Sequence, residues 1–307
     1  MRHPLNRCMQ AASLLAAVFW LTTAATAQTS NEGLSPTLAN IKKTHVVRLG
    51  YRESSPPFSF LDHSNRPIGY SLELCEAIVE EIGVEVDDAN LKIEHVKVTS
   101  DDRIPAVVQN KIDLECGSTT ANAERAKQVA FSPLMFVAGT KLMVPKASTI
   151  SAPKDLQGKT VVVTKGTTNE QAMHTLDKKF SLSLNIVASP DHEQSYQMLV
   201  DGKADAFATD DILLYGLIAR HKTQDKFKVT GEYLSYDPYG IMFRKGEPQL
   251  AAVVERAFRK LGSNRDLVPL YNKWFVGRLP TGEKLGVSIS PQLEEAFKVL
   301  DDTQGAN

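Results

Sequence analysis

Short apolar segments alternate with longer amphipathic segments over residues 46–129. Runs of about four to eight residues rich in valine, isoleucine and leucine are typical of buried strands. Apolar positions three and four residues apart, as in residues 70–82, indicate a helix with one buried face, and Gly83 is its expected end. The pattern predicts strands over residues 46–49, 91–98 and 112–116 and helices over residues 70–82, 103–109 and 123–129. This alternation predicts a mainly parallel sheet covered by helices on both faces.

The same alternation begins again near residue 160. It predicts strands over residues 160–163, 184–187 and 204–208, helices over residues 168–176, 193–200 and 212–221, and later helices over residues 248–261, 267–275 and from Pro291 onward. Tyr271, Trp274 and Phe275 have helical spacing and are interpreted as core packing. Two similar α/β lobes that face each other would form a cleft, and ligands of such sheets bind beyond the carboxyl ends of the strands.

The first 27 residues have the pattern of an export signal. Arg2 and Arg7 precede an apolar run over residues 11–21, and Ala25-Thr26-Ala27 is a cleavage motif of small residues. We expect cleavage after Ala27 and a mature protein in the periplasm or an equivalent space. A membrane anchor is the alternative, although the apolar run is shorter than the roughly 20 residues that span a bilayer.

Composition excludes several classes of protein. Hydrophobic residues make up 42% of the chain and charged residues 23%, which is typical of a globular protein and not of a disordered one. The 35 basic and 36 acidic side chains balance, so no overall charge attracts nucleic acid or an anionic membrane. Cys75 and Cys116 remain after the expected cleavage. A disulfide between them and two buried thiols both fit their surroundings.

Polar side chains gather where the predicted strands end and the next helices begin. Arg52, Arg103 and Arg125 follow three different strands, and each alone is readily explained as a solvated surface residue. Together they indicate a pocket for a small anion, because guanidinium groups bind carboxylates and phosphates through paired hydrogen bonds. Thr168 would add donors from a helix start, and Asp210 fits such a pocket if the ligand also carries an ammonium group.

Other chemical signatures are missing from the sequence. The seven histidines show no metal-ligand spacing, and there is neither a complete phosphate-binding loop nor a Gly-x-Ser-x-Gly motif. We therefore expect no metal and no cofactor. His192 could act as a general base but is better explained as a surface or structural residue at a helix start. The carboxylates with a claim to a place in the cleft are Asp210 and Glu53.

A set of longer motifs occurs in order along the mature chain. They are Arg52-Glu53-Ser54-Ser55-Pro56-Pro57-Phe58-Ser59-Phe60, Gly69-Tyr70-Ser71, Thr99-Ser100-Asp101-Asp102-Arg103-Ile104-Pro105, Glu115-Cys116-Gly117-Ser118-Thr119-Thr120, Phe131-Ser132, Gly139-Thr140 and Val161-Val162-Val163-Thr164-Lys165-Gly166-Thr167-Thr168. Their combination resembles the polar amino-acid-binding proteins of ABC importers, and more specifically the glutamate/aspartate-binding members.

The resemblance implies an α/β fold with two lobes, the type II periplasmic-binding fold. Two parallel-type sheets with flanking helices would be joined by two crossover strands, with the ligand in the cleft between the lobes. The first lobe would comprise residues 28–138 and 240–307, and the second lobe residues 139–239. The crossovers would match residues 137–144 and 239–243.

The resemblance also implies a role for individual residues. Those that match the family's ligand positions are Arg125, Thr120 and Thr168 for the α-carboxylate, Ser118 and Asp210 for the α-ammonium group, and Arg52, Ser100, Arg103 and His192 for the side-chain carboxylate. Two departures stand out. Lys165 replaces a usual small residue, and Asp101 and Asp102 would weaken the attraction of Arg103 for an anion if their side chains turn inward.

The function expected from this resemblance is that of a non-catalytic receptor. It would bind L-glutamate or L-aspartate, deliver it to an inner-membrane ABC permease and act as a monomer, with no nucleic-acid partner. A periplasmic dehydratase of the cyclohexadienyl or prephenate type, built on the same fold, is the main alternative. A sensor module is the third, although no signalling domain is present in the sequence.

Overall fold

The computed structural model describes residues 33–302, so the expected leader and its cleavage site lie outside the described residues. Two five-stranded sheets organise this part of the chain. In order across the first sheet, the strands are β5 (Lys92–Lys97), β1 (Val46–Tyr51), β6 (Leu114–Glu115), β15 (Met242–Arg244) and β7 (Val129–Phe131). Across the second sheet they are β11 (Asn185–Ser189), β10 (Thr160–Thr164), β12 (Ala206–Asp210), β9 (Thr140–Pro145) and β13 (Phe227–Thr230).

The fourth strand of each sheet arrives from the other sheet. β9 follows β8 (Phe136–Ala138) into the second sheet, and β15 follows β14 (Asp237–Tyr239) into the first, while β8 and β14 pair with each other. These are the two expected crossovers. In each sheet the first three strands are parallel and the crossover strand is antiparallel to its neighbours. Both sheets are therefore mixed, with an antiparallel strand added to a parallel set.

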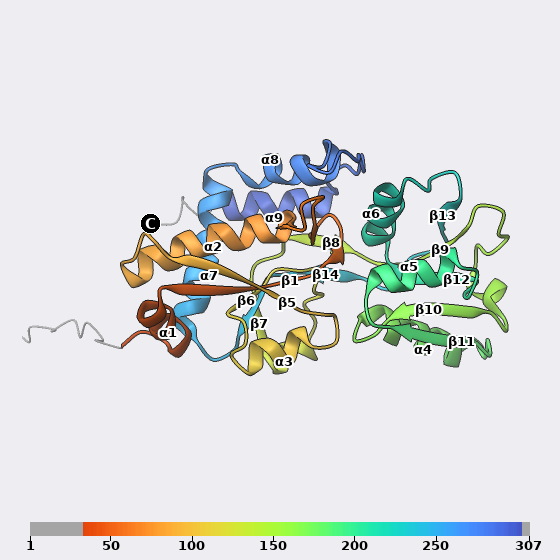
Figure 1. The fold of residues 1–307 in the computed structure, drawn as a ribbon, viewed down its shortest axis with the longest axis horizontal. Helices are drawn as coiled ribbons and strands as arrows, with labels where there is room; N and C mark the ends of the chain where they lie inside the picture. Colours follow the sequence, from red (N-terminus) through yellow and green to blue (C-terminus); the bar gives the residue numbers. More distant parts are fainter. Residues whose placement is uncertain (1–32, 303–307) are drawn as a thin grey trace, which may run out of the picture. The chain divides into compact units, whose positions relative to one another are not determined.

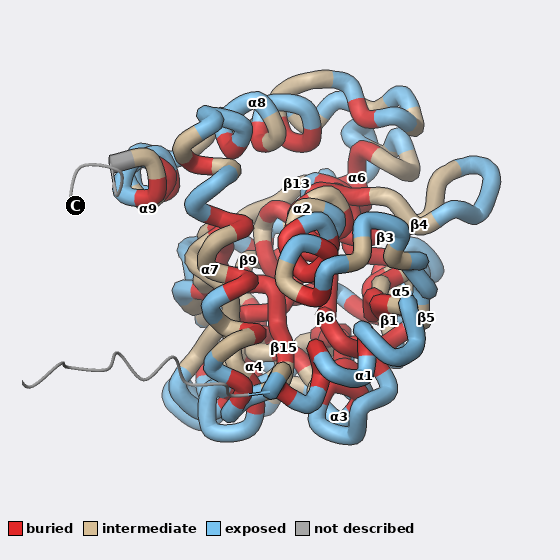
Figure 2. The backbone as a smooth tube through the Cα atoms, turned by 90° about the vertical axis from the view of Figure 1, so that its left-hand side faces the viewer, coloured by how far each residue is buried: buried red, intermediate tan, exposed pale blue. Residues whose placement is uncertain are grey.

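Helices cover both faces of the first sheet, and this sheet with its helices is called the first lobe below (Figure 1). One face shares a core with α1 (Pro36–Thr44), α2 (Tyr70–Val86), α7 (Pro248–Ser263), α8 (Leu267–Tyr271), the π-helical turn η3 (Asn272–Val276) and α9 (Pro291–Asp302). The other face is covered by α3 (Arg103–Val108). Phe243 and Met242, which are neighbours on β15, face these two cores respectively, as the pleat of a strand requires. Figure 2 shows β6 and β15 as buried strands between the helices.

The second sheet with its helices forms the second lobe. Val161 and Val163 pack with α4 (Thr168–Phe180) and the 3₁₀ turn η2 (Pro153–Leu156) on one face. Val162 packs on the other face with α5 (His192–Val200) and α6 (Asp211–His221), and Figure 1 shows these two helices opposite α4. The continuous valine run of β10 therefore reflects a strand that is buried on both faces.

Three helix predictions differ from the structure, one of them only in that the helix expected over residues 168–176 continues to Phe180. The helix expected over residues 123–129 is a single 3₁₀ turn, η1 (Arg125–Lys127), because Val129 already pairs with Arg244 in the sheet. The helix expected to end at Gly83 continues to Val86, and Asp87 caps it in the left-handed conformation. Gly83 is buried within the helix, where an added Cβ would lie 2.8 Å from the carbonyl oxygen of Asp88.

A disulfide joins Cys75 on α2 to Cys116 at the end of β6, with their Cα atoms 6.2 Å apart. It decides between the two alternatives that the sequence leaves open.

A small three-stranded sheet of β2 (Ser54–Ser55), β3 (Ser59–Leu61) and β4 (Pro67–Ile68) follows β1. Tyr271, Trp274 and Phe275 are at most 1% exposed, which confirms them as core residues.

In each sheet the order of the strands reverses at the strand that comes first along the chain, which is β1 in the first sheet and β10 among the parallel strands of the second. The chain passes from β1 to β5 on one side and then to β6 on the other, and β10, β11 and β12 repeat this order. Such a switch leaves a crevice at the carboxyl ends of the strands. The segments that follow β1, β5 and β6, and those that follow β10, β11 and β12, hold the polar residues singled out in the sequence.

Candidate functional site

Three arginines are buried at the carboxyl edge of the first sheet. Arg52 directly follows β1, Arg103 begins α3 and Arg125 begins η1, and they are 1%, 2% and 8% exposed. Burial lowers the pKa of Arg52 to about 10 and that of Arg125 to about 9, and in both cases the charge of Arg103 is the second cause. The structure therefore brings the three cations together, as their positions after separate strands predicted.

The hydrogen bonds of these arginines are incomplete. Arg52 donates from Nη2 to Ser100 Oγ over 2.6 Å, and Arg125 donates to the carbonyl oxygens of Thr120 (2.9 Å) and Gly166 (3.3 Å). Arg52 Nη1 and Arg103 Nε are buried without an acceptor in the described chain. A buried donor without a partner costs about 1–3 kcal/mol, more when it is charged. These groups are suited to a ligand that supplies anionic oxygens.

A buried carboxylate that the sequence analysis did not assign to the cleft lies among the arginines. Glu115, at the end of β6, is fully buried, and its Oε2 accepts a hydrogen bond of 2.6 Å from Thr119 Oγ1. Its charge raises the pKa of all three arginines. An added Cβ at Gly117 would lie 2.2 Å from Glu115 Oε1 and 3.0 Å from Arg52 Cγ, so only glycine fits between these groups.

Glu115 could have been found in the sequence, because a glutamate inside an otherwise apolar strand is itself a signal. Glu53, the carboxylate that was considered instead, forms an ion pair of 2.6 Å with Lys97 and is half exposed. Glu115 is therefore added to the candidate carboxylates of the cleft, while Glu53 lines a cavity beside Arg52 with its carboxylate paired to Lys97.

Threonine hydroxyls connect the two lobes beside Arg125. Thr120 Oγ1 lies 3.3 Å from Thr168 Oγ1, and Thr168 is the first residue of α4. Thr167 caps that helix by accepting a hydrogen bond from the backbone of Glu170. The site thus combines a guanidinium with the positive end of a helix, an arrangement that binds carboxylates. Ser118, from the same segment of the first lobe as Thr120, has a buried Oγ without a partner in the described chain.

His192 enters from the second lobe as the first residue of α5 and is 1% exposed. Its Nδ1 lies 2.7 Å from Thr164 Oγ1, at the end of β10. Burial is the main cause that holds the pKa of His192 well below its usual value, and Arg52 and Arg103 lower the pKa further. The imidazole is therefore neutral at pH 7 and lies close enough to both arginines to sense their charge.

Asp210 is a buried carboxylate beside the crossovers. It accepts hydrogen bonds from Asn169 Nδ2 over 2.8 Å and from the hydroxyl of Tyr239 on β14. Burial is the main cause that raises the pKa of Asp210 to about 7; the charge of Asp237 also raises it, while the hydrogen bonds from Tyr239 and Asn169 lower it. Asp237 in turn accepts a hydrogen bond of 3.0 Å from Thr120 Oγ1. A cation placed here would meet the carboxylates of Asp210 and Asp237.

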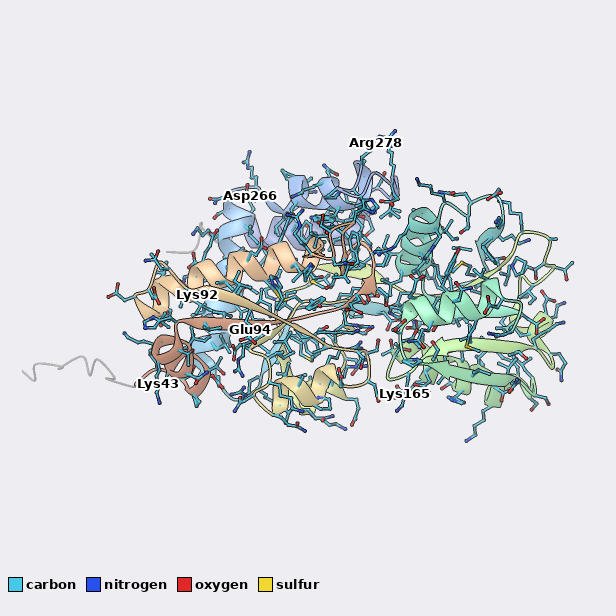
Figure 3. The ribbon with its side chains drawn as sticks, in the orientation of Figure 1. Lys43, Lys92, Glu94, Lys165, Asp266 and Arg278 are labelled. Carbon is cyan, nitrogen blue, oxygen red and sulfur yellow. A yellow bond between two sulfur atoms is a disulfide. The ribbon has the colours of Figure 1, made fainter. Side chains whose placement is uncertain are left out.

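The acidic residues before Arg103 turn outward. Asp101 is exposed and forms an ion pair of 2.9 Å with Lys165, which Figure 3 labels, and Asp102 accepts a hydrogen bond from the backbone of Thr99. Asp101 and Lys165, which both depart from the family pattern, therefore form an ion pair that connects the two lobes at the surface. Next to it, an added Cβ at Gly166 would lie 2.7 Å from Asp101 Cα, so the two backbones approach closely.

Two cavities border this cluster. One, of about 480 Å³, is lined by Arg52, Thr99 and Asp191 among others, and the second, of about 310 Å³, by Ser100 and Arg125 among others. Within residues 33–302, no group of histidine, cysteine, aspartate and glutamate side chains has the arrangement of a metal site. In the same part of the chain, no helix combines the length and apolarity that a membrane span requires.

Curated relatives cover most of the chain. The L-glutamate/L-aspartate-binding protein of Pseudomonas aeruginosa is 40% identical over 264 residues, which are 85% of this chain and 87% of that protein. The glutamate/aspartate import solute-binding protein of Escherichia coli K12 is 35% identical over 267 residues, which are 87% of this chain and 88% of that protein.

Solved structures share the fold. An ancestral arginine-binding protein bound to arginine superposes with a TM-score of 0.68 at 30% identity, over 75% of this chain and 98% of that one. An ancestral amino-acid-binding protein described as a precursor of cyclohexadienyl dehydratase superposes with a TM-score of 0.67 at 30% identity, over 78% and 99% of the two chains. These similarities confirm the predicted two-lobed α/β fold, the type II periplasmic-binding fold. Residues 47–277 match the sequence profile of one family, and the chain belongs to it: the bacterial extracellular solute-binding proteins, family 3.

Proposed function

We propose that this protein is the solute-binding component of an ABC importer, that it binds L-glutamate or L-aspartate between its two lobes, and that it delivers the amino acid to an inner-membrane permease. The observation that carries the proposal is the cluster of buried Arg52, Arg103 and Arg125, two of which have donors without an acceptor among residues 33–302. Buried charges are tolerated when they are paired and hydrogen-bonded, and a dicarboxylic amino acid supplies the missing anions. The names of the curated relatives support the same ligands.

The ligand lies in this proposal with its α-carboxylate at the start of α4. Arg125, Thr120 and Thr168, which already meet across the lobes, bind that group. The unpaired Ser118 Oγ and the carboxylate of Asp210 bind the α-ammonium group. The remaining assigned residues surround the side-chain carboxylate, and these are Arg52, Ser100, Arg103 and His192.

Selectivity for acidic side chains follows from the unpaired donors. Glutamine has the size of glutamate but presents a neutral amide, so it leaves a guanidinium without an anionic partner. A hydrogen bond to a charged group contributes about 1.5–3 kcal/mol, which corresponds to a preference of about ten- to hundredfold for the acid. We expect micromolar or tighter dissociation constants for L-glutamate and L-aspartate.

The proposal includes the lobe boundaries and a location outside the cytoplasm. The first lobe comprises residues 28–138 and 240–307, and the second lobe residues 139–239. The protein acts in the periplasm as a monomer and is not an enzyme. Glu115 lies beside the three arginines and its carboxylate accepts a hydrogen bond from Thr119, so it is engaged by groups of this chain.

Calorimetry on refolded, ligand-stripped protein tests the proposal. L-glutamate and L-aspartate should release heat with a single site, and L-glutamine should bind at least tenfold more weakly. Arg125→Ala should abolish binding of every amino acid, whereas Arg103→Ala should mainly reduce the preference for acidic ones. Arg66→Ala, which removes an exposed arginine paired with Asp62, is the matched control and should bind as the wild type does.

Equal affinity for glutamine would refute the selectivity, and equal losses in the Arg125 and Arg103 variants for all ligands would refute the division of roles. Prephenate is assayed in parallel. Its turnover by the wild-type protein would contradict the assignment as a non-catalytic receptor and favour the dehydratase.

A further inference from the structure

A chain of buried hydroxyls leads away from His192 in the second lobe. Thr164 Oγ1 lies 2.7 Å from His192 Nδ1 and 2.9 Å from Ser195 Oγ. Ser195 Oγ lies 2.6 Å from Ser189 Oγ, which donates over 3.0 Å to the backbone carbonyl oxygen of Asp191. The hydroxyl-bearing residues are at most 4% exposed and come from the ends of β10 and β11 and from α5. The chain is therefore shielded from solvent and ends at a group that can only accept.

The directions of these hydrogen bonds follow from the terminal carbonyl. Each hydroxyl has one proton to donate. Ser189 donates its proton to Asp191, so Ser195 must donate to Ser189, and Thr164 must donate to Ser195. The proton of Thr164 is then committed, and the contact with His192 needs a proton from Nδ1.

A second contact leads to the same assignment. Ser195 Oγ also lies 3.0 Å from the Asp191 carbonyl oxygen, and donation along this path again commits the Ser195 proton. If Thr164 donated to His192 instead, Ser195 would have to donate to Thr164. Ser189 would then have to serve both Ser195 and the Asp191 carbonyl with a single proton, so a second contact, besides one of the two to Asp191, would lack a proton. The arrangement in which Nδ1 donates leaves only one of these five contacts without a proton.

We propose that this hydroxyl chain fixes the proton of neutral His192 on Nδ1, and that Nε2, left as an acceptor, takes up a proton from solvent when an acidic ligand side chain binds. The first half concerns this chain alone, and the second half rests on the proposed function. His192 Nε2 makes no hydrogen bond within residues 33–302, so it is available to a ligand. Thr164, Ser189 and Ser195 are positioning residues in this account, because they act on the ligand only through the imidazole.

The charges around His192 explain why its Nε2 takes up a proton only when the ligand binds. Arg52 from the end of β1 and Arg103 from α3 oppose a third positive charge. The carboxylate of Asp191, the N-cap of the same helix, accepts a hydrogen bond from the backbone N–H of Gln194. The ring of Phe207 on β12, which carries no charge, lies 6.4 Å from the imidazole between centroids. A ligand carboxylate would offset the arginines and would meet a lone pair on Nε2 unless that nitrogen gains a proton.

The tautomer is tested by ¹⁵N nuclear magnetic resonance of the imidazole in ligand-free protein, with His192→Gln identifying the signal. The proposal requires a directly bonded proton on Nδ1 and an unprotonated Nε2 at pH 7. A proton on Nε2 would overturn it. This measurement needs no ligand, so it stands apart from the success or failure of the proposed function.

Proton uptake is tested by calorimetry with L-glutamate at pH 7 in buffers of different ionisation enthalpy. Ser195→Ala frees the Thr164 proton for Nδ1, so Nε2 carries the proton already and donates it to the ligand without uptake. The wild-type protein should therefore take up more protons per ligand than this variant, with a difference approaching one. Thr44→Ala, which removes a hydroxyl–carbonyl bond of 2.9 Å on α1, is the matched control and should behave as the wild type does.

The outcomes separate the two proposals. Binding of glutamate with equal proton uptake by the wild-type and Ser195→Ala proteins would overturn the uptake, while the proposed function would stand. Absence of heat with both L-glutamate and L-aspartate would overturn the proposed function and the uptake with it. The ¹⁵N spectrum would then still decide the tautomer.

Discussion

Replacement of Asp210 by asparagine should make the ligand-free protein less sensitive to pH while it weakens ligand binding. The carboxylate is 3% exposed and is held by Asn169 and Tyr239. An asparagine has nearly the same shape, and its amide oxygen can still accept from Asn169 while its amide nitrogen donates to the oxygen of Tyr239. The substitution therefore removes a titratable group with little change in packing.

The magnitude follows from the pKa of Asp210. A rise from 3.8 to about 7 corresponds to about 4 kcal/mol in favour of the protonated form, at roughly 1.4 kcal/mol for each pKa unit. The folded protein binds the proton more tightly than the unfolded chain, so this stabilisation is complete below pH 3.8 and is lost as the pH rises through 7. Between pH 5 and pH 8 the wild-type protein should lose about 3 kcal/mol of unfolding free energy that the Asp210→Asn variant keeps.

Urea unfolding of ligand-stripped protein at pH 5 and pH 8 measures this difference. Asp225→Asn, at an exposed turn, is the control for a charge change and should follow the wild type. Calorimetry should show that Asp210→Asn binds L-glutamate about ten- to hundredfold more weakly, because the ammonium group loses its ionic partner. Parallel pH profiles for the wild-type and Asp210→Asn proteins would refute the assignment of a buried, uncompensated carboxylate.

Three further predictions concern packing and charge. Gly216→Ala should weaken glutamate binding about five- to hundredfold, because a Cβ there would lie 2.3 Å from the Pro56 carbonyl oxygen of the other lobe. If the lobes separate without ligand, the melting temperature of the ligand-free protein should not change. An unchanged dissociation constant for glutamate would contradict the prediction. Serine at both Cys75 and Cys116 should lower the unfolding free energy in urea by about 4 kcal/mol, since the bond closes a loop of 41 residues; a loss below about 1 kcal/mol would contradict the loop-closure account. Glu115→Gln should lower the unfolding free energy by about 3 kcal/mol, because the buried arginines lose an anionic neighbour; equal stability to the wild type would show that Glu115 does not balance them.

Much of the fold was predictable because it depends on local patterns. The valine run at residues 161–163 and the spaced apolar positions of residues 70–82 each specify an element without reference to the rest of the chain. The positions of Arg52, Arg103 and Thr168 were predictable for a related reason. The segments that follow parallel strands gather at one edge of their own sheet whatever the remaining packing is, and these residues lie in such segments of the two sheets.

Other features depended on partners that are distant in the sequence. The helix expected over residues 123–129 is mostly absent because Val129 pairs with Arg244, more than a hundred residues away. The choice between a disulfide and two thiols required the distance between Cys75 and Cys116, which only the packing of α2 against β6 sets.

The amino-acid sequence was enough to predict the alternation of strands and helices, the family resemblance and the residue types of the candidate site. The electrostatic interactions among those residues, and the protonation of His192, depend on how the chain folds. Glu115 became part of the site because β6 places it beside Arg52, and His192 became neutral because burial and two arginines oppose its protonation. Solvation and Coulomb interactions depend on distances between segments far apart in the chain, and folding alone sets those distances.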